Sequence, residues 1–263
     1  MRPTGLAVRL AIAVPSALAA ALLALPLIAL ATRTSPRHLL DALGDPVVAD
    51  ALRVSLEATA LSLAVVVALG TPLAIALARG TFRGRAALDA LVGVPLALPP
   101  VVAGLALLIA LGRTGPYNGV LDLLGWHIPL TFAAVVVAQA FVGAPYYVYA
   151  LAAGLARVDR AQEEIAASLG ASPWRVFATI TLPQVRVALL SGVVLSAARA
   201  LGEFGATITV AGNLQGRTQT MSTAIYVAFE SDPDGAVALA VILAASGFAV
   251  LLAVRGRRRL PEW

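Results

Sequence analysis

The sequence contains no cysteine and no lysine. Without cysteine, the chain can form no disulfide, no thiolate metal site and no thiol nucleophile. Without lysine, it offers no Schiff-base amine and no P-loop, because that loop ends in Gly-Lys-Ser or Gly-Lys-Thr. We therefore expect this chain to have no ATP site of the Walker kind and to bind no cofactor.

Charge and histidine are scarce as well. Only 13% of the residues are charged, 60% are hydrophobic, and the mean hydropathy is +0.89. A soluble domain has about 25% charged and about 45–50% apolar residues, and its core could not enclose this much apolar surface. The composition therefore predicts an integral membrane protein. The two histidines, His38 and His127, are too isolated to indicate a metal site.

Six apolar segments are long enough to cross a bilayer core, which takes about 20 helical residues. Three prolines break up the third segment, and the carbonyl groups that a break frees must face protein or a cavity. The first segment resembles a signal peptide but exceeds the usual apolar length of about 7–15 residues, so we expect a retained helix. The segments are Leu6–Ala31, Leu56–Ala78, Ala87–Leu111, Leu130–Leu151, Val187–Val210 and Ala236–Val254.

Arginine placement predicts the orientation, because cytoplasmic loops of membrane proteins are enriched in basic residues. With the N-terminus inside, only a minority of the arginines lie outside: Arg33, Arg37, Arg53, Arg113 and Arg217. Both termini then face the cytoplasm. The net charge of +5 fits this bias and indicates no nucleic-acid partner.

These positions predict one membrane domain, since no internal repeat or linker is visible. Residues 1–49 would form the first transmembrane helix and an extracytoplasmic loop. Residues 50–255 would form the transmembrane core, including a cytoplasmic loop at 157–186, and residues 256–263 a basic cytoplasmic tail.

The first half of the loop at 157–186 is typical of a short helix. Asp159, Glu163 and Glu164 lie where carboxylates favour the start of a helix. Gly170 is placed to end that helix, as glycine does just beyond a last turn.

The second half of this loop predicts another short helix. Ser172 can cap it, and Pro173 fits its first position. We expect Leu182-Pro183 to stop this helix before the fifth apolar segment begins. The local pattern fits a purely structural interfacial helix as well as a functional one.

The fifth apolar segment carries unusual polar residues. Arg199 and Glu203 are four apart and would share one helix face. Ionisable residues inside a membrane usually face protein or water, so the two would form a buried structural pair or a wall of a translocation path. Thr207 and Thr209 project to different sides, and each could instead bond back to its own helix. These four residues are the candidates for a translocation path or gate.

Other residues in the spans suggest packing roles. Gly202, Gly205 and Ala206 would let helices approach closely, within the chain or at a homodimer seam. An interfacial aromatic belt would account for Tyr146, Tyr147 and Tyr149.

The loop at 157–186 also resembles a known motif, the cytoplasmic EAA loop of ABC-importer permeases. That pattern is Glu-Ala-Ala, three residues, Gly, nine residues, Ile, one residue and Leu-Pro, and the chain departs from it only at Ile165. The matching positions are Glu164, Ala166, Gly170, Ile180, Leu182 and Pro183.

This resemblance implies the type I ABC-importer permease fold, in which the first short helix of the loop docks into a groove on a separate ATPase. Small side chains would let the helix approach its partner closely, and charge would fix its orientation. The implied ATPase-coupling residues are Glu163, Glu164, Ala166, Ala167, Gly170, Ser172 and Pro173.

Two further stretches, 76–108 and 199–226, are similar to the molybdate and sulfate branch of this family. Within the second stretch, Gly202–Ala206, Ala211–Asn213 and Gly216–Thr220 resemble molybdate permeases more than sulfate permeases. The resemblance implies an importer of molybdate or tungstate, with a sulfate or thiosulfate permease as the alternative.

The resemblance also implies partners. These are a second copy of the chain, a cytoplasmic ATPase dimer that binds ATP and Mg, and an extracytoplasmic oxyanion-binding protein. The chain itself would be no enzyme, although it would serve an ATP-hydrolysing complex.

Two other classes remain as alternatives. A secondary transporter or channel often shows inverted repeats, which are not visible here. A membrane hydrolase would need a motif such as His-Glu-x-x-His or a nucleophile beside a base, and the sequence contains neither.

Overall fold

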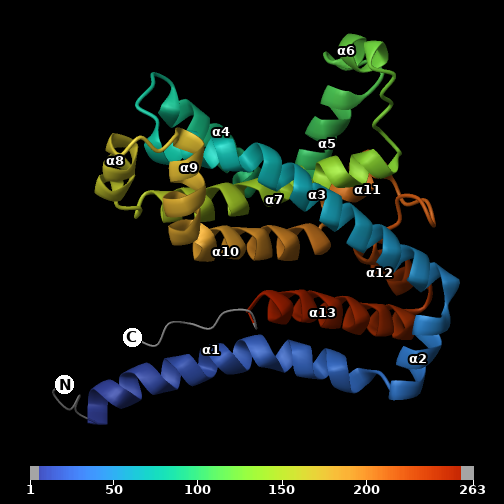
Figure 1. Ribbon diagram of the computed structural model, residues 1–263. Coiled ribbons are helices and arrows are strands. Elements are labelled where there is room, and N and C mark those ends of the chain that lie inside the picture. The colour runs from blue at the N-terminus through green and yellow to red at the C-terminus, as the bar shows by residue number, and fades with distance from the viewer. Residues whose placement is uncertain (1–5, 256–263) are drawn as a thin grey trace.

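The computed structural model describes residues 6–255, which form helices joined by turns and loops (Figure 1). The tail predicted at 256–263 lies outside the described residues. The elements are α1 (Leu6–Arg33), α2 (Pro36–Gly44), α3 (Pro46–Arg79), α4 (Arg85–Ala97), α5 (Pro100–Leu111), α6 (Asn118–Leu123), α7 (Phe132–Leu155), α8 (Arg160–Ser168), α9 (Pro173–Val176), the π-helix η1 (Phe177–Thr181), α10 (Leu182–Leu201), α11 (Gly205–Ala211), α12 (Met221–Ser231) and α13 (Pro233–Arg255).

Four helical stretches in the described part are long and apolar enough to cross a membrane. A fifth span results if the bent pair of α4 and α5 is counted as one. The helix α13 runs over 23 residues, Pro233–Arg255, and covers the sixth predicted segment. All six predicted segments are therefore mainly helical, and four of them coincide wholly or in part with an unbroken stretch of spanning length. The four stretches are Val8–Arg33, Pro46–Arg79, Phe132–Leu155 and Pro173–Leu201.

The third predicted segment is broken, as its prolines indicated. Leu98 is extended, with φ −75° and ψ 135°, because the residue before a proline avoids the helical region. Pro100 then opens α5 at a position that needs no N–H. The chain bends by 118° at this break, which confirms the predicted interruption of the third segment at its prolines.

The helix that begins at Pro173 does not stop at Leu182-Pro183, and this prediction is wrong as well. The chain continues as one helical stretch to Leu201. Within it, the Leu182 N–H bonds to the Phe177 carbonyl, five residues back, in the π-turn of η1. Pro183 lies in the first turn of α10, and the wider turn before it accommodates a residue without an N–H.

The fifth span also ends earlier than predicted. α10 stops at Leu201 and α11 starts at Gly205, so the span predicted as Val187–Val210 contains a break. Glu203 therefore lies beyond the end of the helix that carries Arg199. The two do not share one continuous helix, although their side chains still meet.

The core forms where α7 packs against α3 and α10 (Figure 1). Tyr147 on α7 is fully buried, and its hydroxyl lies 2.7 Å from Thr71 Oγ1. Glycines face its ring, since a Cβ on Gly70 or Gly192 would lie 2.9 or 3.1 Å from ring carbons. Tyr147 is thus a core residue, and its assignment to an interfacial belt is wrong.

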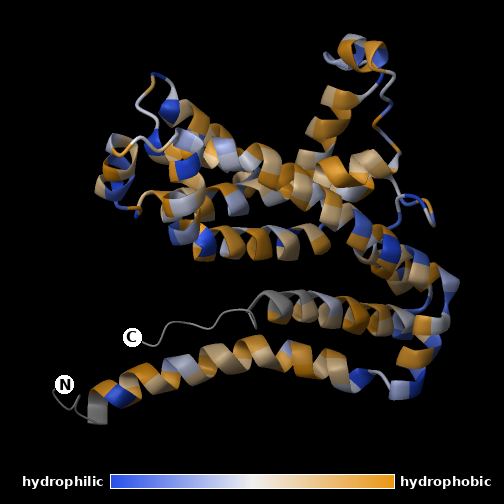
Figure 2. Cartoon of the chain, viewed as in Figure 1, coloured by the Kyte–Doolittle hydropathy of each residue, from blue (hydrophilic) through white to orange (hydrophobic). Residues whose placement is uncertain are grey.

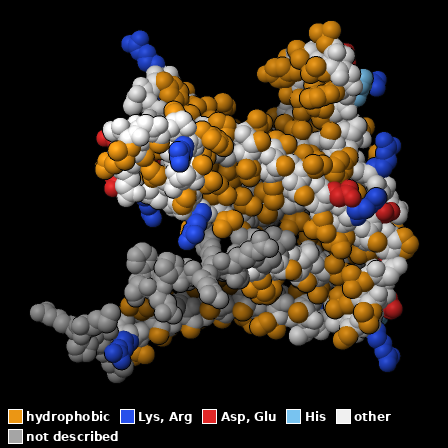
Figure 3. Space-filling model, viewed as in Figure 1, with side chains coloured by type: hydrophobic (Ala, Val, Ile, Leu, Met, Phe, Trp, Pro, Cys, Tyr) orange, Lys and Arg blue, Asp and Glu red, His pale blue; other side chains and the backbone are white. Residues whose placement is uncertain are grey.

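The outer helices expose their apolar side chains. α1 lies beside α13 at one edge, and none of its apolar window is buried (Figures 1 and 2). Apolar side chains also cover much of the visible surface in Figure 3. Such a surface is suited to lipid rather than water. Residues 34–49, predicted as a loop, contain α2 and the start of α3.

The start of α1 and α8 lie at one end of the molecule (left in Figure 1), and α13 runs toward that end. α2 and α12 lie at the other end. The predicted coupling helix therefore lies at the same end of the molecule as the start of α1.

Candidate functional site

The predicted coupling helix is α8, and local sequence signals set both of its ends. Asp159 caps the start, because its Oδ1 accepts the Ala161 N–H at 3.0 Å. Gly170 ends it with φ +85°, a conformation that glycine adopts without strain. The N–H of Gly170 bonds to Ala167 O and that of Ala171 to Ala166 O, both at 3.0 Å, which is a Schellman motif. The predicted helix and bend are confirmed.

The second helix starts as predicted. Ser172 Oγ accepts the Arg175 N–H at 3.4 Å, and Pro173 occupies the first turn of α9. α8 is therefore a short helix that a fixed bend joins to the long α9–η1–α10 stretch.

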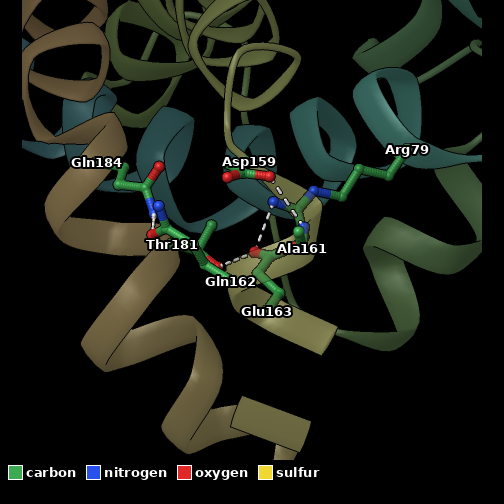
Figure 4. A network of polar contacts seen from close by, with 7 residues as sticks. All are labelled: Arg79, Asp159, Ala161, Gln162, Glu163, Thr181 and Gln184. Carbon is green, nitrogen blue, oxygen red and sulfur yellow. Dashed lines mark hydrogen bonds and ion pairs between the residues drawn. The ribbon is translucent and has the colours of Figure 1, made fainter. Parts of the chain in front are cut away.

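Glu163 points inward from α8, as Figure 4 shows. Its Oε1 accepts hydrogen bonds from Arg79 Nη2 at 2.9 Å and from the Thr181 hydroxyl. Arg79 ends α3 and Thr181 ends η1, so one carboxylate joins three elements. A second link runs from Gln184 Nε2 on α10 to Gln162 Oε1, at 3.1 Å. Sequence reasoning placed Glu163 with the docking residues and missed Arg79 and Thr181.

These contacts change the acidity of Glu163. Burial disfavours its charge, but hydrogen bonds from Thr181 and Arg79, with the positive charges of Arg79 and Arg160, outweigh this effect. The pKa of the Glu163 carboxyl therefore lies below its usual value. The carboxylate is ionised at neutral pH, as an ion pair with Arg79 requires.

The outer side of this unit presents charge and apolar side chains together. Glu164 and Ala167 are exposed on α8, while Ala166 is half-buried. Leu169 is 83% exposed and Trp174 is 76% exposed, although large apolar residues at a polar end are usually covered. A hollow of about 490 Å³ lies beside them, between α8, α9 and the end of α3. This outer surface therefore combines a carboxylate, small residues and exposed large apolar side chains.

Two of the four predicted path residues, Arg199 and Glu203, meet at the junction between α10 and α11. Arg199 Nη2 lies 2.5 Å from Glu203 Oε2, so the predicted ion pair is confirmed. The other oxygen, Oε1, accepts the Ala206 N–H of α11 at 2.7 Å. The Glu203 side chain is fully buried, whereas that of Arg199 is 25% exposed.

The two threonines of α11 differ in their contacts. Thr209 donates its hydroxyl to the Gly205 carbonyl at 2.7 Å, which is the back-bonded alternative. Thr207 is fully buried, and its hydroxyl has no hydrogen-bond partner among the described residues. Their roles as path residues stay predictions.

α11 packs closely on α5 through small residues. A Cβ on Gly205 would lie 2.8 Å from Pro100 Cβ, and one on Gly104 would lie 2.8 Å from the Ala206 Cα. Gly205 and Ala206 therefore serve a seam within the chain. Among the described residues, no cluster of three or more acidic, histidine or cysteine side chains could hold a metal ion.

Comparisons with known proteins agree with this architecture. The chain is 42% identical over 234 residues to the molybdenum transport system permease protein ModB of Mycobacterium bovis, covering 89% of each chain. It is 38% identical to the chloroplastic sulfate permease 2 of Chlamydomonas reinhardtii, covering 81% of this chain and 58% of that one.

A bacterial alginate ABC transporter, solved with a periplasmic protein that carries an alginate pentasaccharide, has the same fold. It superposes with a TM-score of 0.75 at 19% identity, covering 96% of this chain and 94% of that one. The fold is that of a type I ABC-transporter permease, in a protein that crosses the inner membrane several times. Residues 70–256 match the family described as binding-protein-dependent transport system inner membrane component, and the chain belongs to that family.

Proposed function

We propose that this chain is the permease subunit of an ATP-driven importer that moves molybdate or tungstate into the cell by alternating access. Two copies form the pore, each docks one subunit of a cytoplasmic ATPase dimer, and an extracytoplasmic binding protein delivers the oxyanion. ATP and Mg are bound by the ATPase, since this chain has no lysine for a P-loop.

The exposed helix α8 carries the coupling part of the proposal. It presents Glu164 and Ala167 outward, with Leu169 and Trp174 beside them, while Glu163 ties it to α3 and η1. A docked ATPase that shifts α8 therefore also pulls on the ends of two long helices. Glu163 acts here by holding α8 in place, and Glu164 meets the partner.

The proposed orientation places in the cytoplasm the end of the molecule that holds α8 and the start of α1 (Figure 1). Arginines near this end, such as Arg79, Arg83 and Arg160, favour its placement in the cytoplasm. An ATPase in the cytoplasm can then reach α8.

The cargo is inferred from the relatives. The 42% identity to a molybdenum permease over 89% of both chains favours molybdate. The 38% identity to a sulfate permease makes sulfate the second candidate. Arg199 is a cationic candidate for the path, because its partly exposed guanidinium could face an oxyanion. Thr207 and Thr209 remain candidates on the same short helix, α11.

Binding-protein-stimulated ATP hydrolysis by the reconstituted complex tests the cargo. Molybdate, tungstate and sulfate are added separately, each loaded on the cognate binding protein. We expect stimulation by molybdate and tungstate. Stimulation by sulfate alone would replace molybdate with the second candidate, and no stimulation by any of the three would contradict the proposed importer.

A further inference from the structure

We propose that Glu203 is a positioning residue that fixes α11, and with it α5, to the end of α10. The inference rests on the proposed function, because it explains how motion that starts at α8 reaches the broken part of the bundle. It assigns Glu203 a mechanical role instead of contact with the oxyanion.

The geometry of the carboxylate carries this inference. The helix ends at Leu201, so no continuous backbone helix joins α10 to α11. Glu203 bridges the gap with both oxygens, because one meets Arg199 on α10 and the other accepts the Ala206 N–H of α11. A fully buried carboxylate is costly in a membrane protein unless both oxygens are satisfied. Here Oε1 accepts a hydrogen bond from Ala206 of α11, while Oε2 accepts no hydrogen bond among the described residues and has its charge balanced by Arg199 of α10.

The link extends to α5 by close packing. Gly205 lies against Pro100, and Ala206 lies against Gly104, with no room for an added Cβ at either glycine. Such contacts leave little freedom for α11 to slide on α5. α5 is also the second half of the pair bent by 118°, so its first residues lie next to the break between α4 and α5.

A continuous series of contacts thus leads from α8 to α5. Glu163 bonds to Thr181, which lies in the helical stretch that runs on to Arg199. When α10 moves, its contact with Glu203 would move α11 as well, and the close packing of α11 on α5 would move α5. If the pair had only a structural role, it would be enough for the two buried charges to balance each other. A link between α10 and α11 would then not be needed for transport.

A transport measurement separates these two roles. In the reconstituted complex, we expect Glu203→Gln to lower the molybdate taken up per ATP hydrolysed about tenfold, as for loss of a coupling contact. Glutamine can still accept the Ala206 N–H, but its amide group cannot pair with Arg199. The double variant Arg199→Gln/Glu203→Gln removes both charges and leaves none unpaired. The inference predicts that its uptake ratio stays low, and recovery to the wild-type ratio would overturn it.

Asp50→Asn is the matched control. Asp50 and Arg53 form an exposed ion pair of 3.3 Å, three residues apart on α3. Arg53 Nη2 also donates to the Gly216 carbonyl at 3.4 Å, a bond that does not use the Asp50 carboxylate. We expect the uptake ratio of this variant to stay within about twofold of the wild type. An equal loss in Asp50→Asn and the double variant would show that loss of any ion pair disturbs transport, which would contradict the inference.

Hydrogen exchange gives a readout that does not need transport. Backbone amides of α11 should exchange about tenfold faster in the double variant than in the wild type, while those of α8 stay unchanged. Equal protection of α11 in both proteins would overturn the inference. Absence of uptake by the wild-type complex would instead contradict the proposed function, and the exchange comparison would still decide the role of Glu203.

Discussion

Two carboxylates, Glu163 and Glu203, each meet an arginine, but they lie in different parts of the molecule. Glu163 lies at the end that carries α8 and joins residues 84 and 18 positions away. Glu203 lies at the break between α10 and α11 and joins residues four and three positions away.

The burial of the two pairs differs as well. The side chains of Arg79 and Glu163 are 27% and 13% exposed, whereas that of Glu203 is fully buried. A carboxylate near water can lose its partner and be solvated, but an enclosed one cannot. The comparison indicates that the first pair holds a docking unit in place, while the second holds a break in a membrane helix together.

The largest predicted loss of stability comes from removing the buried Glu203 carboxylate. Glu203→Ala leaves the Arg199 charge and the Ala206 N–H without their partner. We expect a loss of about 3 kcal/mol in stability, the lower end for breaking a buried pair, because Arg199 remains partly exposed. Thermal unfolding of the purified complex in detergent measures it. The double variant Arg199→Gln/Glu203→Gln serves as the control and should recover most of the stability. A Glu203→Ala protein as stable as the wild type would contradict the proposed difference between the buried Glu203 pair and the more exposed Glu163 pair.

A smaller effect is expected from acid at Glu163. Its pKa in the folded protein is lowered, so the ionised pair contributes stability above the usual carboxyl pKa, and this contribution is lost as pH falls through the lowered value. Glu163→Gln should therefore be less stable than the wild type at neutral pH. The difference between them should shrink as the solution is acidified.

Unfolding midpoints from neutral to acidic pH measure this effect. Because other carboxylates also titrate, only the difference between the two proteins is informative. A difference that stays constant or grows on acidification would show that the Glu163 charge contributes nothing.

The smallest effect should come from the exposed pair on α3. The side chains of Arg53 and Asp50 are 56% and 37% exposed, so solvent screens their attraction. We expect Asp50→Asn to change stability by less than about 1 kcal/mol. A loss as large as that from Glu203→Ala would mean that burial does not explain the order of these effects.

Local signals were sufficient for much of the site. The N-cap of Asp159, the left-handed Gly170 and the cap at Ser172 each depend on residues within one turn. The pairing of Arg199 with Glu203 was also predicted from a spacing of four, and the pair forms although the helix ends between the two residues. Such features can be predicted because the competing conformations are also local.

Features that depend on distant or competing contacts were not predicted. No spacing rule relates Arg79 to Glu163, since α3 and α8 meet only in the folded chain. Leu182-Pro183 indicated a stop, but the π-turn of η1 absorbed the proline. The end of α10 was missed because apolar content continues through Val210, while the Glu203 carboxylate bonds to α11 across the break.

The central claim is that α8 couples this permease to ATP hydrolysis, and uptake by the charge-reversed helix tests it most directly. Proteoliposomes holding the full complex are loaded with ATP on the ATPase side, and molybdate uptake is followed for the wild type, Glu164→Arg and Gly170→Pro. Glu230→Arg, an exposed glutamate on α12, is the control. We predict that both α8 variants insert into the membrane but take up no molybdate, while the control transports normally. Uptake by both α8 variants at the wild-type rate would contradict the coupling role of α8.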